Sequence, residues 1–114
     1  MRLSDKQAEY TEWVGLLIAW TATQRDADGH RLYRLRFGDA YRDSRVTYGH
    51  VKSTHRFRLG IDLILDKWDG KKWVYQTSTK AYEPLGVFWE SLGGTWGGRF
   101  KDGNHFSRKH NGVG

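Results

Sequence analysis

The sequence predicts one α+β domain in which two main helices accompany a small antiparallel sheet. Two segments repeat apolar residues at helical spacing, and most of the expected strands lie between them. Two of these strands are joined by an Asp-Gly hairpin signal, which favours antiparallel pairing. A chain of 114 residues suits a single domain, 1–114, and leaves no room for a second of ordinary size.

The first helix is expected from Asp5 to Gln24. Its start is indicated by a capping-box sequence, in which Ser4 caps the amide of Gln7 and Gln7 reaches back. An Asp-Ala-Asp-Gly turn follows at 26–29. The apolar residues that share its helical spacing are Tyr10, Trp13, Leu17 and Trp20.

The second helix is expected to open at Pro84, because proline suits the first turn of a helix. Gly93 and Gly94 end it. The tail from Thr95 to Phe106 mixes glycine with aromatic residues and is expected to add strand. The apolar face of this helix consists of Leu85, Phe88, Trp89 and Leu92.

Three strands are expected before the second helix. Leu32 to Phe37 alternates polar and apolar residues, as a half-buried strand does. Leu59 to Leu65 is an apolar run, and the turn Lys67 to Lys71 joins it to a short strand from Trp73 to Tyr75. The polar segment from Gly38 to Ser53 has little periodicity and predicts a long loop, of the kind that often carries function.

Composition excludes several classes of protein. There are no cysteines, which rules out disulfides, thiolate zinc fingers and a cysteine nucleophile. Any metal site must therefore use His, Asp and Glu. The formal net charge of +6 favours polyanions, but no recognisable nucleic-acid-binding motif accompanies it, so nucleic acid is not expected as a partner.

No secretion signal is expected at the start of the chain. The apolar run from Trp13 to Trp20 is short, and acidic residues precede it where a signal would carry basic ones. The same run is too short to span a bilayer, so membrane insertion is not expected either.

Four residues suggest metal chemistry. His55, Asp62 and His105 form a reasonable ligand set for catalytic zinc, with a fourth position left to water. Asp102, three residues before His105, could serve as the general base. Other interpretations stay open at this point: His55 could be an ordinary surface histidine, and Asp62, within an apolar strand, could instead pair with an arginine.

Segments of the chain resemble the D-alanyl-D-alanine carboxypeptidase and L-alanyl-D-glutamate endopeptidase family. Ser53 to Asp62 resembles the first metal motif, Ser-x-His followed after six residues by Asp. Trp96 to Phe106 resembles the second and most specific motif, Trp-Gly-Gly-x-Phe/Trp and then Asp-x-x-His-Phe. Gly38 to Arg42 looks like the family's Gly-Tyr-Arg element, and Leu3 to Trp20 looks like the start of short phage members.

The resemblance implies a zinc-dependent peptidase whose small α+β fold is shared with the hedgehog signalling domain. By it, the acidic residue of the second motif is the catalytic acid/base, and the arginine of the Gly-Tyr-Arg element faces the substrate carbonyl or a stem-peptide carboxylate. The implied site comprises the catalytic residues Asp102 and Arg42, the zinc ligands His55, Asp62 and His105, and the substrate-binding residues Ser53 and Trp96.

Some positions depart from the family's pattern or allow a second interpretation. Arg58 stands where the first motif usually has glycine, and Gly60 where it has a small residue that is often alanine. This change affects the expected substrate preference more than metal binding. Arg45 is a rival for the role of Arg42, and Trp96 also suits a core or cleft wall because buried aromatics mostly pack.

The function implied by the resemblance is hydrolysis of the peptidoglycan stem peptide, with the L-Ala–D-Glu bond as the expected target. A monomeric phage endolysin would wait in the host cytoplasm and reach the wall once the membrane is permeabilised, and an enzyme carried in a virion would fit as well. The alternatives are a D-Ala-D-Ala carboxypeptidase or dipeptidase, and a non-catalytic zinc-binding module.

Overall fold

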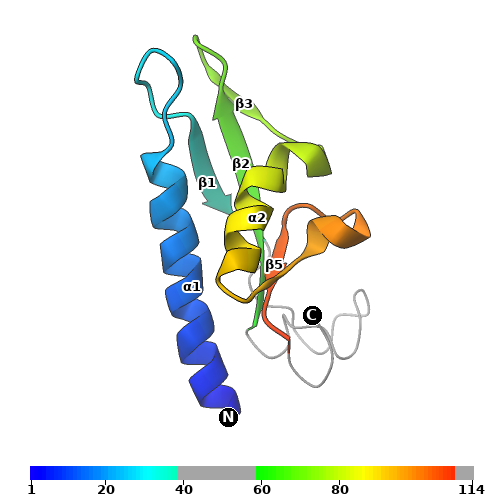
Figure 1. Cartoon of the computed structure of the whole chain (residues 1–114). Helices are drawn as coiled ribbons and strands as arrows, with labels where there is room; N and C mark the ends of the chain where they lie inside the picture. Colours follow the sequence, from blue (N-terminus) through cyan, green and yellow to red (C-terminus); the bar gives the residue numbers. More distant parts are fainter. Residues whose placement is uncertain (39–58, 110–114) are drawn as a thin grey trace.

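The computed structural model describes residues 1–38 and 59–109, and these confirm the α+β class. In this part of the chain two helices accompany an open antiparallel sheet of five strands (Figure 1). The helices and strands are α1 (Leu3–Thr23), β1 (Tyr33–Phe37), β2 (Gly60–Trp68), β3 (Trp73–Tyr75), η2 (Thr79–Tyr82), α2 (Glu83–Ser91), β4 (Thr95–Trp96), η3 (Gly97–Phe100) and β5 (His105–Ser107). The residues discussed above that lie outside the described ranges are Arg42, Arg45, Ser53, His55 and Arg58.

Strand β2 forms the centre of the sheet. Strand β1 pairs along one edge of β2, while β5 and β3 share the other edge, β5 beside the start of β2 and β3 beside its end (Figure 1). Tyr82 fills the gap between β5 and β3, where its hydroxyl accepts a hydrogen bond of 2.9 Å from the N–H of Leu65. The edge of β2 therefore stays hydrogen-bonded where no strand covers it.

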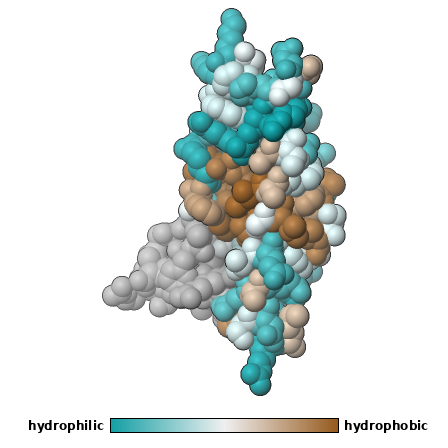
Figure 2. All heavy atoms as spheres, turned by 90° about the vertical axis from the view of Figure 1, so that its left-hand side faces the viewer, coloured by the Kyte–Doolittle hydropathy of each residue, from teal (hydrophilic) through white to brown (hydrophobic). Residues whose placement is uncertain are grey.

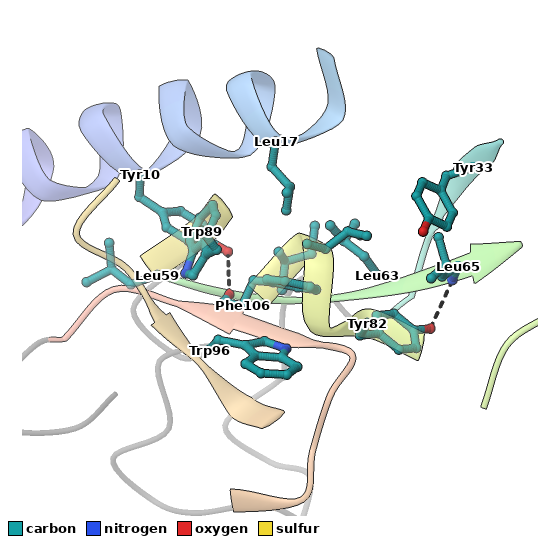
Figure 3. Close-up of a cluster of buried hydrophobic side chains, with 12 residues drawn as sticks. Tyr10, Leu17, Tyr33, Leu59, Leu63, Leu65, Tyr82, Trp89, Trp96 and Phe106 are labelled. Atoms are coloured by element: carbon teal, nitrogen blue, oxygen red, sulfur yellow. Dashed lines mark hydrogen bonds between the residues drawn. The ribbon is translucent and has the colours of Figure 1, made fainter. Parts of the chain in front are cut away.

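The core lies between the two helices and one face of the sheet (Figure 3). Leu17 of α1 and Trp89 of α2 are fully buried, as are Leu63 of β2 and Phe106 of β5. The Trp89 ring meets Tyr10 and Phe106 edge-on, with centroids 5.6 and 5.8 Å apart, a favoured aromatic geometry. The apolar spacing that singled out Leu17 and Trp89 in the sequence is thus confirmed as marking core positions.

Two hydrogen bonds from the helices fix strand β5. The hydroxyl of Tyr10 donates to the carbonyl of Phe106 at 3.0 Å, and Nε1 of Trp89 donates to the carbonyl of Ser107 at 2.9 Å. Burial, and then the charge of Asp62, raise the pKa of Tyr10 well above its usual value, so its hydroxyl remains a donor. Each bond contributes about 1 kcal/mol. The strand that begins at His105 is thereby held against both helices.

Helix α1 is apolar around much of its middle, so it exposes apolar side chains as well as burying them. Leu16 is 50% exposed although its neighbour Leu17 is fully buried. Figure 2 shows this side of the molecule, with hydrophobic residues across the middle and hydrophilic ones at both ends. None of the helices in the described ranges combines the length and hydropathy needed to span a bilayer.

The expected helices and strands agree with the structure except at two boundaries, while the loop expected from Gly38 to Ser53 lies outside the described residues from 39 onward. Helix α1 begins at Leu3 behind the N-cap residue Arg2, and no side chain caps it. The capping box predicted at Ser4 was therefore wrong: the helix has already begun there, and the N–H of Lys6 bonds to the carbonyl of Arg2. Strand β2 continues to Trp68, beyond its expected end, because its last residues pair with β3 across the hairpin.

The face of the sheet away from the helices carries charged side chains. Because successive residues of a strand point to opposite faces, Asp62 and Asp66 of β2 share this face with Arg34 and Arg36 of β1. Asp66 is only 2% exposed. It accepts hydrogen bonds from Nε of Arg34 at 2.7 Å and from Nε and Nη2 of Arg36 at 3.0 and 2.9 Å.

The two arginines decide the ionisation of Asp66. Burial alone would raise the pKa of this carboxyl, but the hydrogen bonds and charges of Arg36 and Arg34 outweigh burial, so the pKa lies below its usual value. We call these three residues the arginine cluster.

Replacing Asp66 with asparagine should lower the free energy of unfolding by about 2 kcal/mol at neutral pH, because two arginines lose their shared carboxylate. A carboxyl whose pKa is depressed in the folded state stabilises the fold above its unfolded pKa of about 3.9 and loses this contribution as the pH falls through the folded pKa. Denaturant unfolding of both proteins at pH 7 and at about pH 2 measures the difference. A gap that persists at low pH would contradict the electrostatic explanation.

Candidate metal centre and catalytic loop

Asp62 of β2 and His105 of β5 stand opposite each other in the antiparallel pairing of the two strands. Nδ1 of His105 lies 3.0 Å from Oδ1 of Asp62. Opposite residues of paired strands project from the same face, so strand register alone brings the imidazole to the carboxylate. The side chains of His105 and Asp62 are 14% and 22% exposed, which places the pair at the surface of the charged face.

The geometry of this pair fits part of a zinc site. Imidazole nitrogen and carboxylate oxygen bind zinc at about 2.0–2.2 Å, so two such donors on one tetrahedral ion stand about 3.3 Å apart. The observed 3.0 Å between the Asp62 and His105 atoms is close to this spacing. Within residues 1–38 and 59–109 no three potential metal-binding side chains gather, and the expected third ligand, His55, lies outside these ranges.

Asp102 lies in the turn between η3 and β5, in a segment (97–104) that we call the Asp102 loop. Its N–H donates to the carbonyl of Gly97 at 2.9 Å, and its own carbonyl accepts from the N–H of His105 at 3.2 Å. The side chain is exposed. One backbone hydrogen bond thus connects the proposed acid/base to the strand that carries His105, and the other joins it to Gly97 at the start of the loop.

Lys101, which precedes Asp102, has a left-handed backbone with φ of 63°. This conformation costs a residue with a side chain roughly 1–2 kcal/mol. It ends η3 and turns the chain, so that the following residue can bond back to Gly97. The Asp102 loop is therefore held in a conformation that local preference alone would not choose.

Close packing explains the first glycine of the Trp-Gly-Gly sequence. A Cβ atom on Gly97 would lie 2.3 Å from the carbonyl oxygen of Asp102 and 2.8 Å from Cβ of His105. Neither distance is tolerated by real side chains. Only glycine lets the start of the loop lie this close to both Asp102 and His105.

Trp96 supports the loop from within the core. Its ring is 2% exposed, and its Nε1 donates to the carbonyl of Gly103 at 2.7 Å. A Cβ on Gly98 or on Gly86 would lie 2.1 Å from this ring, so both glycines make room for the indole. The burial agrees with the interpretation of Trp96 as a core aromatic, and the substrate contact also expected of it stays a prediction.

A small polar pocket of about 150 Å³ opens beside the Asp102 loop. Asp102, Lys101 and Asn104 line it from the loop, and Tyr75 and Thr79 line it from the segment that leaves β3. We call it the loop pocket. Its walls therefore combine hydroxyl and amide groups with one cation and one carboxylate.

A known protein family matches the part of the sequence that carries these residues. The family described as D-alanyl-D-alanine carboxypeptidase matches residues 47–108, which is more than half of the chain. The chain belongs to this peptidase family. The match includes His55, Asp62, Asp102 and His105. It begins at residue 47 and therefore does not include Arg42. A search of curated proteins found no match.

As a member of the D-alanyl-D-alanine carboxypeptidase family, the protein is a peptidase that acts on peptidoglycan-type substrates. Peptidases of this family are generally zinc-dependent, which agrees with the donor types and spacing of Asp62 and His105. The sequence-based assignment to this family is confirmed.

Some residues near the site were not singled out from the sequence. Asp66 was missed because the apolar run ends at Leu65, so the residues after it resembled the flank of a turn. Its even spacing from Asp62 was the available signal, since both then face the same side of β2. Lys101 gave no signal, because a left-handed lysine cannot be read from sequence.

Replacing Gly97 with alanine should destabilise the protein by roughly 2 kcal/mol and impair the site, because the added methyl group displaces Asp102 or His105. Gly15 is the matched control: it lies in α1 with nothing within 4 Å of an added Cβ. There the same change should stabilise by about 0.5–1 kcal/mol through helix propensity. Thermal unfolding of both variants measures these effects, and equal stabilities would contradict the packing explanation.

Proposed function

We propose that the protein is a zinc-dependent endopeptidase that cuts the peptidoglycan stem peptide at the L-Ala–D-Glu bond. The observation that supports it most is the cross-strand pair of Asp62 and His105, 3.0 Å apart inside the region matched by the family. Two metal-binding side chains on a partly exposed sheet face leave room for a substrate, as a catalytic site requires and a closed structural site does not.

In this proposal His55, Asp62 and His105 hold the metal. When bound, a zinc ion would supply Lewis-acid chemistry that activates a water and polarises the substrate carbonyl. Strand pairing fixes two of the three ligands before any metal binds, so little ordering is left to metal binding at these positions. The contribution of His55 rests on the Ser-x-His motif.

Asp102 is the proposed acid/base. Its carboxylate accepts the proton of the attacking water and later returns it to the leaving amine. Its exposed side chain and its backbone bonds beside His105 suit this role. Arg42 stabilises the negative charge that develops on the carbonyl oxygen, and Ser53 contacts the substrate. The roles of these last two rest on the motifs in the sequence.

A second candidate is D-Ala-D-Ala carboxypeptidase or dipeptidase activity, favoured by the description of the matching family. The chemistry would be the same, and only the bond presented to the site would differ. A non-catalytic zinc-binding module is less well supported, because a purely structural site has no need of an acid/base such as Asp102.

Purified peptidoglycan should yield new ends at L-Ala and D-Glu when incubated with the protein. Chelator should abolish these products and added zinc should restore them, because the activated water depends on the metal. Mass spectrometry of the fragments identifies the bond. Release of D-Ala or its dipeptide would instead establish the second candidate, and zinc binding without any product would contradict a catalytic role.

Two variants serve as controls for this experiment. Asp102→Ala should keep bound zinc and lose turnover, because an acid/base is removed and no ligand. His105→Ala should lose zinc and some stability together. Metal analysis and thermal unfolding distinguish these cases: an empty site in Asp102→Ala would make Asp102 a ligand, and stoichiometric zinc with an unchanged melting temperature in His105→Ala would exclude that residue.

We also propose that the protein acts as a monomeric phage endolysin, which waits in the host cytoplasm and reaches the wall once the membrane is permeabilised. The net charge of +6 supports association with anionic wall polymers. Cells that express the protein should lyse only after a membrane-permeabilising agent is added, as followed by culture turbidity. Lysis without that agent would contradict the proposal.

A further inference from the structure

The arginine cluster occupies the same sheet face as the metal pair. Along β2, Asp66 follows Asp62 by four residues, a distance of about 13 Å in an extended strand. Arg36 lies opposite Ile64, midway between these two carboxylates. A peptide that binds at Asp62 and His105 and runs along β2 would therefore meet the Arg36 side chain within a few residues.

The guanidinium of Arg36 is held in a defined position. Asp66 binds its Nε and Nη2, and its central carbon lies 5.8 Å from the centre of the Tyr75 ring. The side chain is nevertheless 51% exposed, and the hydrogen bonds within the described part of the chain leave Nη1 available. Arg36 thus combines a fixed orientation with an accessible donor, which reduces the entropy lost on binding an anion.

Tyr75 connects this arginine to the loop pocket. It is 58% exposed and lines the pocket together with Lys101 and Asp102. The pocket, at about 150 Å³, is smaller than the roughly 300 Å³ at which drug-sized ligand sites begin, so it suits a single small polar group. Its hydroxyl, amide and ammonium groups are suited to an anion.

We propose that the loop pocket, with Lys101 in its wall and Arg36 beside its Tyr75 side, binds a carboxylate of the stem peptide near the cut bond. The identity of this ligand rests on the proposed function, because the D-Glu residue of the stem carries such a group. Asp102 lies at the same pocket and would repel a second carboxylate. The ligand carboxylate therefore lies toward Lys101 and Tyr75.

The charge balance around the site supports this direction. Arg34, Arg36 and Lys101 provide three cations, against the carboxylates of Asp66 and Asp102, while Asp62, on the same sheet face, lies against His105 in the metal pair. Asp66 is buried and already bound by both arginines. The accessible part of the surface between Tyr75 and the loop is therefore cationic on balance, and a free carboxylate is favoured over a neutral amide at that position.

The test compares two stem-peptide analogues that carry either the free carboxylate or its carboxamide. In both, a reduced bond replaces the target amide so that neither is cut, and binding to the purified protein is measured by calorimetry. The carboxylate should bind about tenfold more tightly, as a charge-assisted hydrogen bond provides. This preference should fall toward one in Arg36→Gln and in Lys101→Asn. Asparagine tolerates the left-handed backbone, so the second variant keeps the loop conformation.

Matched controls remove the same charges elsewhere. Arg31→Gln changes an exposed arginine whose Nε bonds to the carbonyl of Tyr33, and Lys71→Asn changes an exposed lysine in the β2–β3 turn. Both should keep the full carboxylate preference. Thermal unfolding verifies that each variant is folded. If Arg36→Gln destabilises the protein because Asp66 loses a partner, the carboxylate preference of Lys101→Asn alone tests the proposal.

Equal affinity of the unaltered protein for the two analogues would overturn the proposal, as would a preference that survives both substitutions. The protein could instead bind a glycerol phosphate polymer tightly, in a way that depends on Arg36, and show no carboxylate preference among the peptides. That result would indicate that these cations bind wall polymer and would contradict the proposal. Hydrolysis is measured separately on cleavable peptides. Carboxylate preference without hydrolysis would support this subsite and contradict the proposed function. Hydrolysis without carboxylate preference would support the proposed function and contradict the subsite.

Discussion

The pairing of β2 with β5 is the constraint on which the rest of the site depends. Its register sets Asp62 opposite His105, and a slip of one residue would turn the imidazole toward the helices. What prevents the slip lies on the other face of the sheet. Phe106 is fully buried against Trp89, and Tyr10 binds its carbonyl. The apolar core on one face of the sheet therefore determines the position of the polar pair on the other face.

The Asp102 loop satisfies a second constraint, which is steric. The chain must leave β4 and return to β5 within a few residues, with an acidic side chain placed just before the proposed metal ligand His105. Gly97 permits the close approach of the two ends, and the left-handed Lys101 makes the reversal. Trp96 then fills the space beneath the loop and binds Gly103. Trp96 and Gly97 of the second motif therefore each have a structural reason that is independent of catalysis.

Much of the fold could be predicted because local pattern and tertiary structure agree. The spacing of Leu17 and Trp89 within their helices marked residues that prove fully buried, and the Asp-Gly turn at Asp69 and Gly70 joined β2 to β3 as expected. The capping box failed because residue type alone does not say where a helix has already begun. Here the helix begins at Leu3, one residue before Ser4.

The candidate site, too, could be predicted from the sequence only in part. Asp62 could be selected from sequence because a carboxylate in an apolar strand needs a partner. Which partner it takes depends on strand register, and in the folded chain this register sets His105 beside it. Register between segments more than 40 positions apart is a property of the folded chain, so residue type made His105 only one candidate and the family motif indicated it specifically.

The arginine cluster raises a question that stability alone does not answer. Replacing a buried ion pair by apolar residues of similar volume is often neutral or stabilising, so a nearly buried carboxylate between two arginines is weak evidence of a need for stability. Arg34 and Arg36 are themselves about half exposed, which further lowers the energy their pairing contributes. Asp66 does, however, fix two guanidinium groups on the face that carries Asp62 and His105. Removing Asp66 alone is costly because it leaves two arginines without their carboxylate, but apolar residues could replace the whole cluster at little cost. The orientation of its cations toward the candidate site is therefore better explained by the proposed carboxylate binding than by stability.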